Sequence, residues 1–227
     1  MGQDSELLRY SMDGHVELFS TMRYASMPYP VITPKQVHGY RSARIDSPTV
    51  SSDSLDGFDA LMTDIPGCAI GVRTADCVPV FLFDPVKKAV AVIHSGWKGT
   101  VQKICLHTIN DMYSAYGTDA SSLLAVIGPC IRMEHFQVRE EVSSLFKQAG
   151  FPIDRIWKWT GIPEEGNMRG GHHIDLAEAN RWILETAGVN PENIRDCGIC
   201  TYEDTRFFSA RREGVECGRI INAIRLL

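Results

Sequence analysis

Residues 74–100 read TADCVPVFLFDPVKKAVAVIHSGWKGT, and this stretch decides the fold because it holds two apolar runs with chemically distinctive ends. The first run covers residues 78–83 and the second covers residues 89–93. Neither run alternates between apolar and polar side chains, which predicts two strands that are buried on both faces. Asp84 and Pro85 fit the first two positions of a type I turn, so we expect the strands to form a hairpin.

The register of this hairpin determines whether side chains at the start of the first strand and the end of the second can bind one ion. If Asp84 pairs with Lys87 across the turn, Cys77 lies opposite His94. Directly opposed residues of antiparallel strands have Cβ atoms roughly 4.5–5.5 Å apart, which is close enough for both side chains to bind one ion. A slip of one residue would instead place them on opposite faces of the sheet.

The composition describes an acidic globular protein with a substantial core. The chain has 227 residues, of which 44% are hydrophobic and 22% are charged, and its net charge is −5. The acidic balance argues against nucleic acid or an anionic membrane as the main partner, and no apolar run is long enough to cross a bilayer. Seven cysteines without a disulfide-like spacing are typical of a reducing compartment. We therefore expect a cytoplasmic protein.

The rest of the chain predicts one α+β domain, residues 1–227, in which helices cover a mixed β-sheet core as in an α/β/β/α sandwich. Apolar residues at helical spacing predict helices that end at Gly117, Gly150 and Gly188, the last beginning at an Asp175 cap. Further strands are expected at residues 15–19, 59–63, 69–73 and 123–127, and within 194–226. Loops are expected at residues 46–58 and 160–173, which are rich in small and charged residues.

Cysteine and histidine residues near the ends of the apolar segments are the main candidates for chemistry. Cys77, His38 and His94 form a ligand set that zinc favours, and three protein ligands would leave a fourth position for water or substrate. The residue pattern alone leaves a second interpretation open, in which Cys77 is a buried core thiol and both histidines are simply hydrogen-bonded. Asp76 is an acid/base, a partner of a metal ligand, or only the cap at the entry of a strand.

Several motifs follow one another along nearly the whole chain. They are Gln36-Val37-His38-Gly39, Thr74-Ala75-Asp76-Cys77-Val78-Pro79-Val80, His94-Ser95-Gly96-Trp97-Lys98-Gly99, Ile127-Gly128-Pro129-Cys130-Ile131, Cys200-Thr201-Tyr202, Phe207-Phe208-Ser209-Ala210-Arg211-Arg212 and Gly218-Arg219. In this order they resemble the YfiH-like family, also called the laccase-domain or multicopper polyphenol oxidase family. Two departures are a shorter segment between Arg23 and Gln36, and Ala210 where the family often has tyrosine.

The resemblance implies a metal-dependent purine nucleoside phosphorylase. Such an enzyme cleaves adenosine, inosine, guanosine or methylthioadenosine with phosphate, and it deaminates adenosine as a secondary activity. The resemblance places the metal ligands on His38, Cys77 and His94 and thereby favours the metal site over the core interpretation. We expect zinc, or copper as the alternative, with Asp76 as the residue that moves a proton.

Phosphorolysis also requires an anion site, and arginine recognises phosphate with two parallel hydrogen bonds. Trp97 either stacks on the purine or packs in the core. The candidates for binding substrate or phosphate are Arg23, Gln36, Arg73, Lys98, Arg211 and Arg212.

Other functional classes remain as alternatives. A trinuclear copper oxidase relies on paired His-x-His motifs, and this chain has seven histidines and no such pair; a phenol oxidase with a single copper ion stays open. The zinc deaminase signature is also missing, because Pro129-Cys130 is not followed by a second cysteine. A hydrolase that uses Cys77 with a histidine, and a partner-binding module without catalysis, are the remaining alternatives. Cys197 and Cys200 form a lone C-x-x-C pair, which we interpret as core cysteines, with a redox pair as the alternative.

Overall fold

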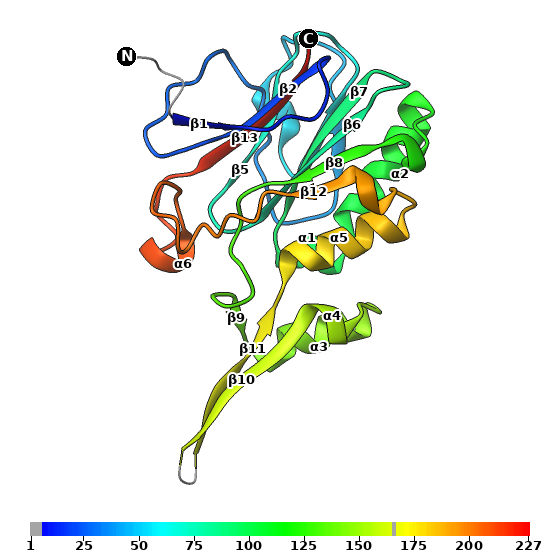
Figure 1. The fold of residues 1–227 in the computed structure, drawn as a ribbon. Coiled ribbons are helices and arrows are strands. Elements are labelled where there is room, and N and C mark those ends of the chain that lie inside the picture. The colour runs from blue at the N-terminus through cyan, green and yellow to red at the C-terminus, as the bar shows by residue number, and fades with distance from the viewer. Residues whose placement is uncertain (1–5, 165–166) are drawn as a thin grey trace.

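The computed structural model of the chain describes residues 6–164 and 167–227. Residues 1–5 and 165–166, which the single-domain prediction includes, lie outside the described residues. The centre of the fold is a six-stranded mixed sheet with the order β12-β8-β6-β7-β4-β3 (Figure 1). Its strands are β3 (Ser42–Arg44), β4 (Ala60–Thr63), β6 (Val78–Asp84), β7 (Ala89–Ser95), β8 (Leu124–Ile127) and β12 (Ile194–Asp196).

The predicted hairpin forms its central pair, β6 and β7, but the predicted register is wrong by two positions. Pro79 rather than Cys77 lies opposite His94, and Asp84 pairs with Ala89. The connection is longer than a two-residue turn because Lys88 adopts a left-handed conformation with φ 54°. A shift of two residues preserves which side chains share a face, so the expectation that the two ends lie together survives.

A second, antiparallel sheet packs on one face of the central sheet. It has the order β1-β2-β13-β5 and consists of β1 (Leu7–Arg9), β2 (Val16–Thr21), β5 (Ile70–Thr74) and β13 (Ile220–Leu226). Odd-numbered apolar residues of β6, such as Phe81 and Phe83, pack toward this second sheet. Even-numbered residues, such as Val80 and Leu82, pack toward the helices on the other face. This period of two explains why both hairpin strands are fully apolar.

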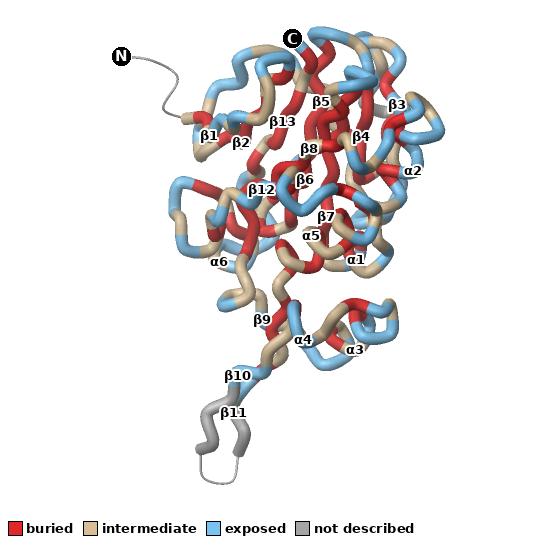
Figure 2. Tube along the Cα trace, turned by 45° about the vertical axis from the view of Figure 1, so that its right-hand side comes forward, coloured by how far each residue is buried: buried red, intermediate tan, exposed pale blue. Residues whose placement is uncertain are grey.

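Helices cover the other face of the central sheet. They are α1 (Trp97–Val101), α2 (Ile104–Tyr116) and α5 (Leu176–Thr186). As predicted, α2 ends at Gly117, which has φ 71°, and Asp175 caps α5 by accepting a hydrogen bond from the Glu178 N–H. Figure 2 shows the buried segments concentrated in the strands that these layers enclose. The predicted α+β fold with a mixed sheet and helical layer is confirmed.

One expectation about loops is wrong. Residues 157–164 and 167–174 form a hairpin of β10 (Trp157–Glu164) and β11 (Asn167–Ile174) that extends away from the body beside α3 (Glu140–Gln148) and α4 (Ile153–Ile156) (Figure 1). Its backbone is satisfied by pairing along the hairpin and with β9 (Gln137–Val138), so a glycine-rich composition did not prevent strand formation. Residues 46–58 form the expected loop, which includes a short 3₁₀ helix, η2 (Ser52–Leu55).

The tail contains less strand than the sequence predicts. Between β12 and β13 the chain forms loops and one short helix, α6 (Ala210–Glu213), which Ser209 caps through the Arg212 N–H. Two more 3₁₀ helices, η3 (Ala120–Ser122) and η4 (Pro191–Asn193), precede β8 and β12. None of the helices in the described part of the chain has the length and apolar character needed to span a membrane.

Candidate metal centre

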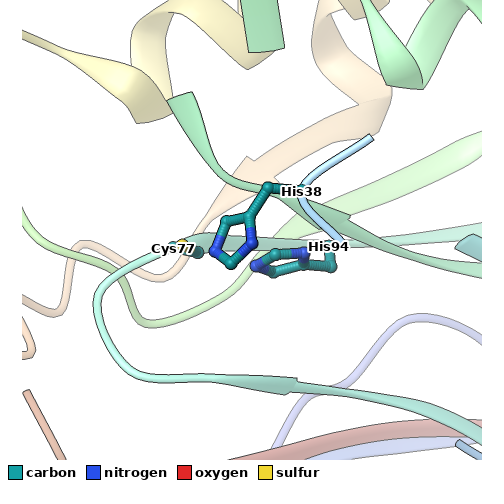
Figure 3. A group of neighbouring side chains, drawn as sticks. All are labelled: His38, Cys77 and His94. Carbon is teal, nitrogen blue, oxygen red and sulfur yellow. The ribbon is translucent and has the colours of Figure 1, made fainter. Parts of the chain in front are cut away.

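Three side chains from separate segments meet at one end of the two central strands, β6 and β7. His38 lies in the loop before β3, Cys77 directly precedes β6, and His94 is in β7. Their sulfur and ring nitrogen ligand atoms all lie within 4.8 Å of one another. The two imidazole rings meet edge to face with centroids 4.8 Å apart, beside the Cys77 side chain (Figure 3). The structure thus brings together the cysteine and both histidines, which we call the cysteine–histidine trio.

Asp59, which directly precedes β4, holds two of these residues from behind. Its fully buried carboxylate accepts a hydrogen bond from Nδ1 of His94 at 2.7 Å. A carboxylate can only accept, so Nδ1 carries the proton and Nε2 of His94 is left to bind a metal. The same carboxylate accepts the backbone N–H groups of Val37, His38 and Gly39 at 3.2, 2.9 and 2.7 Å. Asp59 therefore fixes the ring of one histidine and the backbone of the other.

The backbone around the trio is shaped to leave space between the three ligands. A Cβ atom at Gly96 would lie 3.0 Å from the His38 ring and 3.2 Å from the Cys77 sulfur. His38 itself has φ 60°, a left-handed conformation that a residue with a side chain adopts only when its surroundings hold it there. One thiol and two imidazoles around a glycine-lined gap fit a zinc or copper ion, for which these are preferred donors.

The charges of the trio are strongly coupled. Burial alone would raise the pKa of the Cys77 thiol, but the His94 and His38 imidazoles lower it to about 6. Burial alone would lower the pKa of His94, whereas Cys77 and the Asp59 carboxylate raise it to about 9. At neutral pH the metal-free site therefore holds a thiolate beside an imidazolium. The thiolate is the form of cysteine that binds metal, and His94 must lose its proton when an ion binds.

The trio opens into a cavity of about 670 Å³, and Arg73 of β5 lines the same cavity. Within the part of the chain that the structure describes, the exposed Arg73 guanidinium has no hydrogen-bond or ion-pair partner. Gln36 also lines the cavity, and its amide holds the Arg73 backbone: Nε2 donates to the Arg73 carbonyl at 2.8 Å and Oε1 accepts from the Arg73 N–H at 2.7 Å. An unpartnered guanidinium on a fixed backbone faces the same space as the trio.

Asp76 is buried, and both of its carboxylate oxygens have partners. Oδ1 accepts a hydrogen bond from the Thr201 hydroxyl at 2.7 Å, and Oδ2 accepts one from the Arg211 backbone N–H at 2.6 Å. Asp76 adopts φ 89°, and Cys77 follows it directly. These contacts tie the segment that carries Cys77 to the C-terminal tail.

The other expected phosphate ligands have partners within the chain. Arg23 donates to the Thr205 and Phe207 carbonyls and pairs with Glu213. Arg212 donates to three backbone carbonyls and to the same carboxylate. The side chain of Arg211 donates to the His135 and Gln137 carbonyls. We call Arg23, Arg211 and Arg212 the arginine cluster, and none of the three is among the residues that line the cavity.

Lys98 and Trp97 follow the trio at the start of α1. Lys98 is exposed and its amine lies 5.6 Å from the centre of the Trp97 ring. Trp97 packs against the apolar core beneath the helices, which agrees with the core interpretation of this residue. The Lys98 side chain is not one of those that line the cavity.

Asp59 was not predicted from the sequence, although its position before an apolar strand is unusual for an acidic residue. Asp59 begins the apolar strand that runs through residues 60–62, and an acidic residue in that position must find several donors once it is buried. The second missed feature is that no described residue pairs with the Arg73 guanidinium, which no sequence pattern reveals.

Comparison with known proteins relates the whole arrangement to one family. Residues 17–227 match the family described as multi-copper polyphenol oxidoreductase laccase. A purine nucleoside phosphorylase of Bacteroides thetaiotaomicron is 39% identical over 209 residues, which cover 89% of this chain and 75% of that protein. Adenosine deaminase RL5 from an unknown prokaryotic organism is 39% identical over 201 residues, covering 86% and 74%. The crystal structure of the hypothetical protein YfiH from Bacillus licheniformis has a TM-score of 0.80 at 25% identity and covers 93% of each chain.

Proposed function

Because the chain belongs to the multi-copper polyphenol oxidoreductase laccase family, we propose that it is a metal-dependent purine nucleoside phosphorylase that converts adenosine, inosine, guanosine or methylthioadenosine and phosphate into free base and sugar 1-phosphate. The observation that carries this proposal is the shared cavity, which has a metal-ligand trio on one wall and the unpartnered Arg73 guanidinium on another. Relatives of the chain are named purine nucleoside phosphorylase.

His38, Cys77 and His94 would hold the ion, which we propose is zinc. When bound, such an ion supplies a Lewis acid that polarises a substrate oxygen or lowers the pKa of a water molecule. Asp59 keeps the Nε2 atom of His94 directed at the ion, and the Asp76 contacts to Thr201 and Arg211 hold the segment of Cys77 in place. In this proposal Asp76 positions a ligand rather than moving a proton, because Asp76 is buried and is not among the residues that line the cavity.

The cationic wall of the cavity would bind the second substrate. Arg73 can hold two phosphate oxygens in parallel hydrogen bonds while Gln36 keeps its backbone fixed. In the reaction a phosphate oxygen forms a bond to C1′ of the sugar, the bond from C1′ to the purine nitrogen breaks, and the departing base takes up the proton that the phosphate loses. Holding both reactants in one cavity replaces a bimolecular encounter with an oriented pair. The arginine cluster holds the tail through backbone carbonyls, and tail residues such as Ala210 and Val215 line the cavity.

Adenosine deamination is a second proposed activity, favoured by the 39% identity to a protein named adenosine deaminase. In this reaction water replaces the 6-amino group, giving inosine and ammonia without consuming phosphate. The seven free thiols fit a reducing compartment, so we propose a cytoplasmic location.

The function is tested by incubating purified protein with a panel of nucleosides, with and without phosphate, and by analysing free base, sugar 1-phosphate and ammonia. We expect phosphate to accelerate release of hypoxanthine from inosine strongly and the sugar product to be phosphorylated. Release of free ribose at an equal rate without phosphate would make the enzyme a hydrolase instead. Metal analysis of protein purified without added copper, together with an assay of phenol oxidation, separates the phosphorylase from a copper oxidase.

A further inference from the structure

A second group of metal-ligating side chains lies outside the cysteine–histidine trio. It consists of His135, Cys200 and Glu203, whose ring nitrogen, sulfur and carboxylate ligand atoms all lie within 4.8 Å of one another. Nε2 of His135 and Oε1 of Glu203 are 2.8 Å apart. None of these residues lines the cavity of the trio, so the proposed phosphorylase chemistry leaves this group unexplained.

The two less exposed ligands of this group are held on a fixed backbone. The His135 N–H donates to the Arg132 carbonyl at 3.0 Å, and its own carbonyl accepts from the Arg211 guanidinium at 2.8 Å. Tyr202 stacks on the His135 ring, with centroids 4.4 Å apart and planes inclined by 21°. Cys200 is 6% exposed, and its backbone forms an isolated parallel β-bridge with the backbone of Cys130. The geometry of nitrogen and sulfur is therefore set before any ion arrives, which lowers the cost of binding.

The third ligand lies toward solvent and leaves an entry path for an ion. The side chain of Glu203 is 65% exposed and that of His135 is 28% exposed. A contact between side chains this exposed contributes little to stability. The contact between His135 and Glu203 therefore does not explain why the Cys200 sulfur lies within 4.8 Å of both side chains.

We propose that His135, Cys200 and Glu203 form a second metal site, for zinc or a similar divalent ion with mixed nitrogen, sulfur and oxygen ligands. Three protein ligands leave a fourth position that water fills. The site joins the segment after β8, which carries His135, to the tail segment that carries Cys200 and Glu203. An ion bound there would cross-link these two segments, and the tail segment includes Thr201, whose hydroxyl holds Asp76 next to Cys77.

The test counts bound ions in the full chain after removal of metal and dialysis against zinc. Cys77→Ser removes a ligand of the first site, and Glu203→Gln removes the exposed ligand of the second. Glu141→Gln, an exposed acidic residue on α3 outside both groups, is the matched control. Circular dichroism verifies that each variant is folded. Cobalt replaces zinc in parallel samples because a bound cysteine thiolate gives cobalt a charge-transfer absorption band.

We expect two zinc ions in wild type and in Glu141→Gln, one in Cys77→Ser, one in Glu203→Gln and none in the double variant. Cobalt-loaded Cys77→Ser should keep a thiolate charge-transfer band, which a further Cys200→Ser change removes. Loss of all zinc in Cys77→Ser, or a cobalt spectrum of that variant without a thiolate band, would overturn the second site. One ion in wild type that Glu203→Gln removes but Cys77→Ser does not would support the second site and contradict the first.

Discussion

The cysteine–histidine trio and the arginine cluster differ in what their polar atoms contact. The trio turns its ligand atoms into the cavity, and Asp59 supports it from inside the protein. The arginine cluster turns its guanidinium groups onto backbone carbonyls and onto Glu213, whose pKa the hydrogen bond from Arg23 lowers to about 2. The difference indicates that residues of two kinds lie close together in this fold, those that line the cavity and those that hold the tail.

The largest expected effect separates Cys77 from Cys130. Cys77→Ala leaves two imidazoles, which are too few protein ligands for firm zinc binding, so turnover of inosine should fall by several orders of magnitude while the fold survives. Cys130 is fully buried in the apolar core beneath the helices, and burial raises the pKa of its thiol well above the usual value. Cys130→Ala should cost on the order of 1 kcal/mol of stability and spare metal content.

Bound metal, melting temperature and inosine turnover are measured for both variants. If Cys77→Ala keeps the metal of the trio and most of its rate, the trio is not the functional site. If both variants lose activity only in proportion to stability, the two cysteines are equivalent core thiols.

The affinity of the trio for zinc should depend steeply on pH. In the metal-free site the pKa of His94 is raised to about 9 and that of Cys77 is lowered to about 6. Between these values His94 gives up one proton for each ion bound, so lowering the pH by one unit should weaken binding about tenfold. Below about pH 6 the thiolate also takes up a proton, and the slope should approach a hundredfold per unit. The measurement is zinc titration in metal-buffered solutions, and an affinity that does not change with pH would contradict the thiolate–imidazolium pair.

Asp59→Asn tests the support behind the trio at nearly constant volume. The amide keeps one acceptor oxygen but places an NH₂ group against backbone N–H donors and the Nδ1 proton of His94. Loss of such a partner behind a ligand weakens metal binding by about 10- to 100-fold. Asp64→Asn, in the loop that follows β4, serves as the control and should leave zinc affinity unchanged. A variant that is less stable but binds zinc with wild-type affinity would restrict Asp59 to a purely structural role.

The smallest expected effect separates Arg73, which lines the cavity, from Arg212 of the arginine cluster. Arg73→Gln removes a charged donor to phosphate, so KM for phosphate should rise about tenfold with metal content and melting temperature unchanged. Arg212→Gln removes donors to three carbonyls and Glu213, so the melting temperature should fall by roughly 5 °C with KM for phosphate unchanged. Initial rates over a range of phosphate concentrations decide the question, and the reverse pattern would place phosphate at the arginine cluster.

The trio was predicted because the family resemblance assigns the metal ligands to His38, Cys77 and His94. The period of two that places Cys77 and His94 on one face also survives an error of two residues in register. Asp59 was not predicted because its role depends on the backbone of residues 37–39, which is distant in sequence and adopts a left-handed turn. The orientation of the arginine cluster was equally hidden, since its acceptors are carbonyls of an irregular tail. The β10–β11 hairpin was missed because glycine-rich composition outweighed the weak strand pattern, whereas pairing between its two strands satisfies the backbone.

The most direct test of the central claim is to remove metal from the wild-type protein, add zinc in steps and follow sugar 1-phosphate formation from inosine and phosphate. We predict no turnover without metal and a rise in rate as the cysteine–histidine trio fills, matched by Cys130→Ala and absent in Cys77→Ala at every zinc concentration. Full phosphate-dependent turnover in the metal-free wild-type protein would contradict the account.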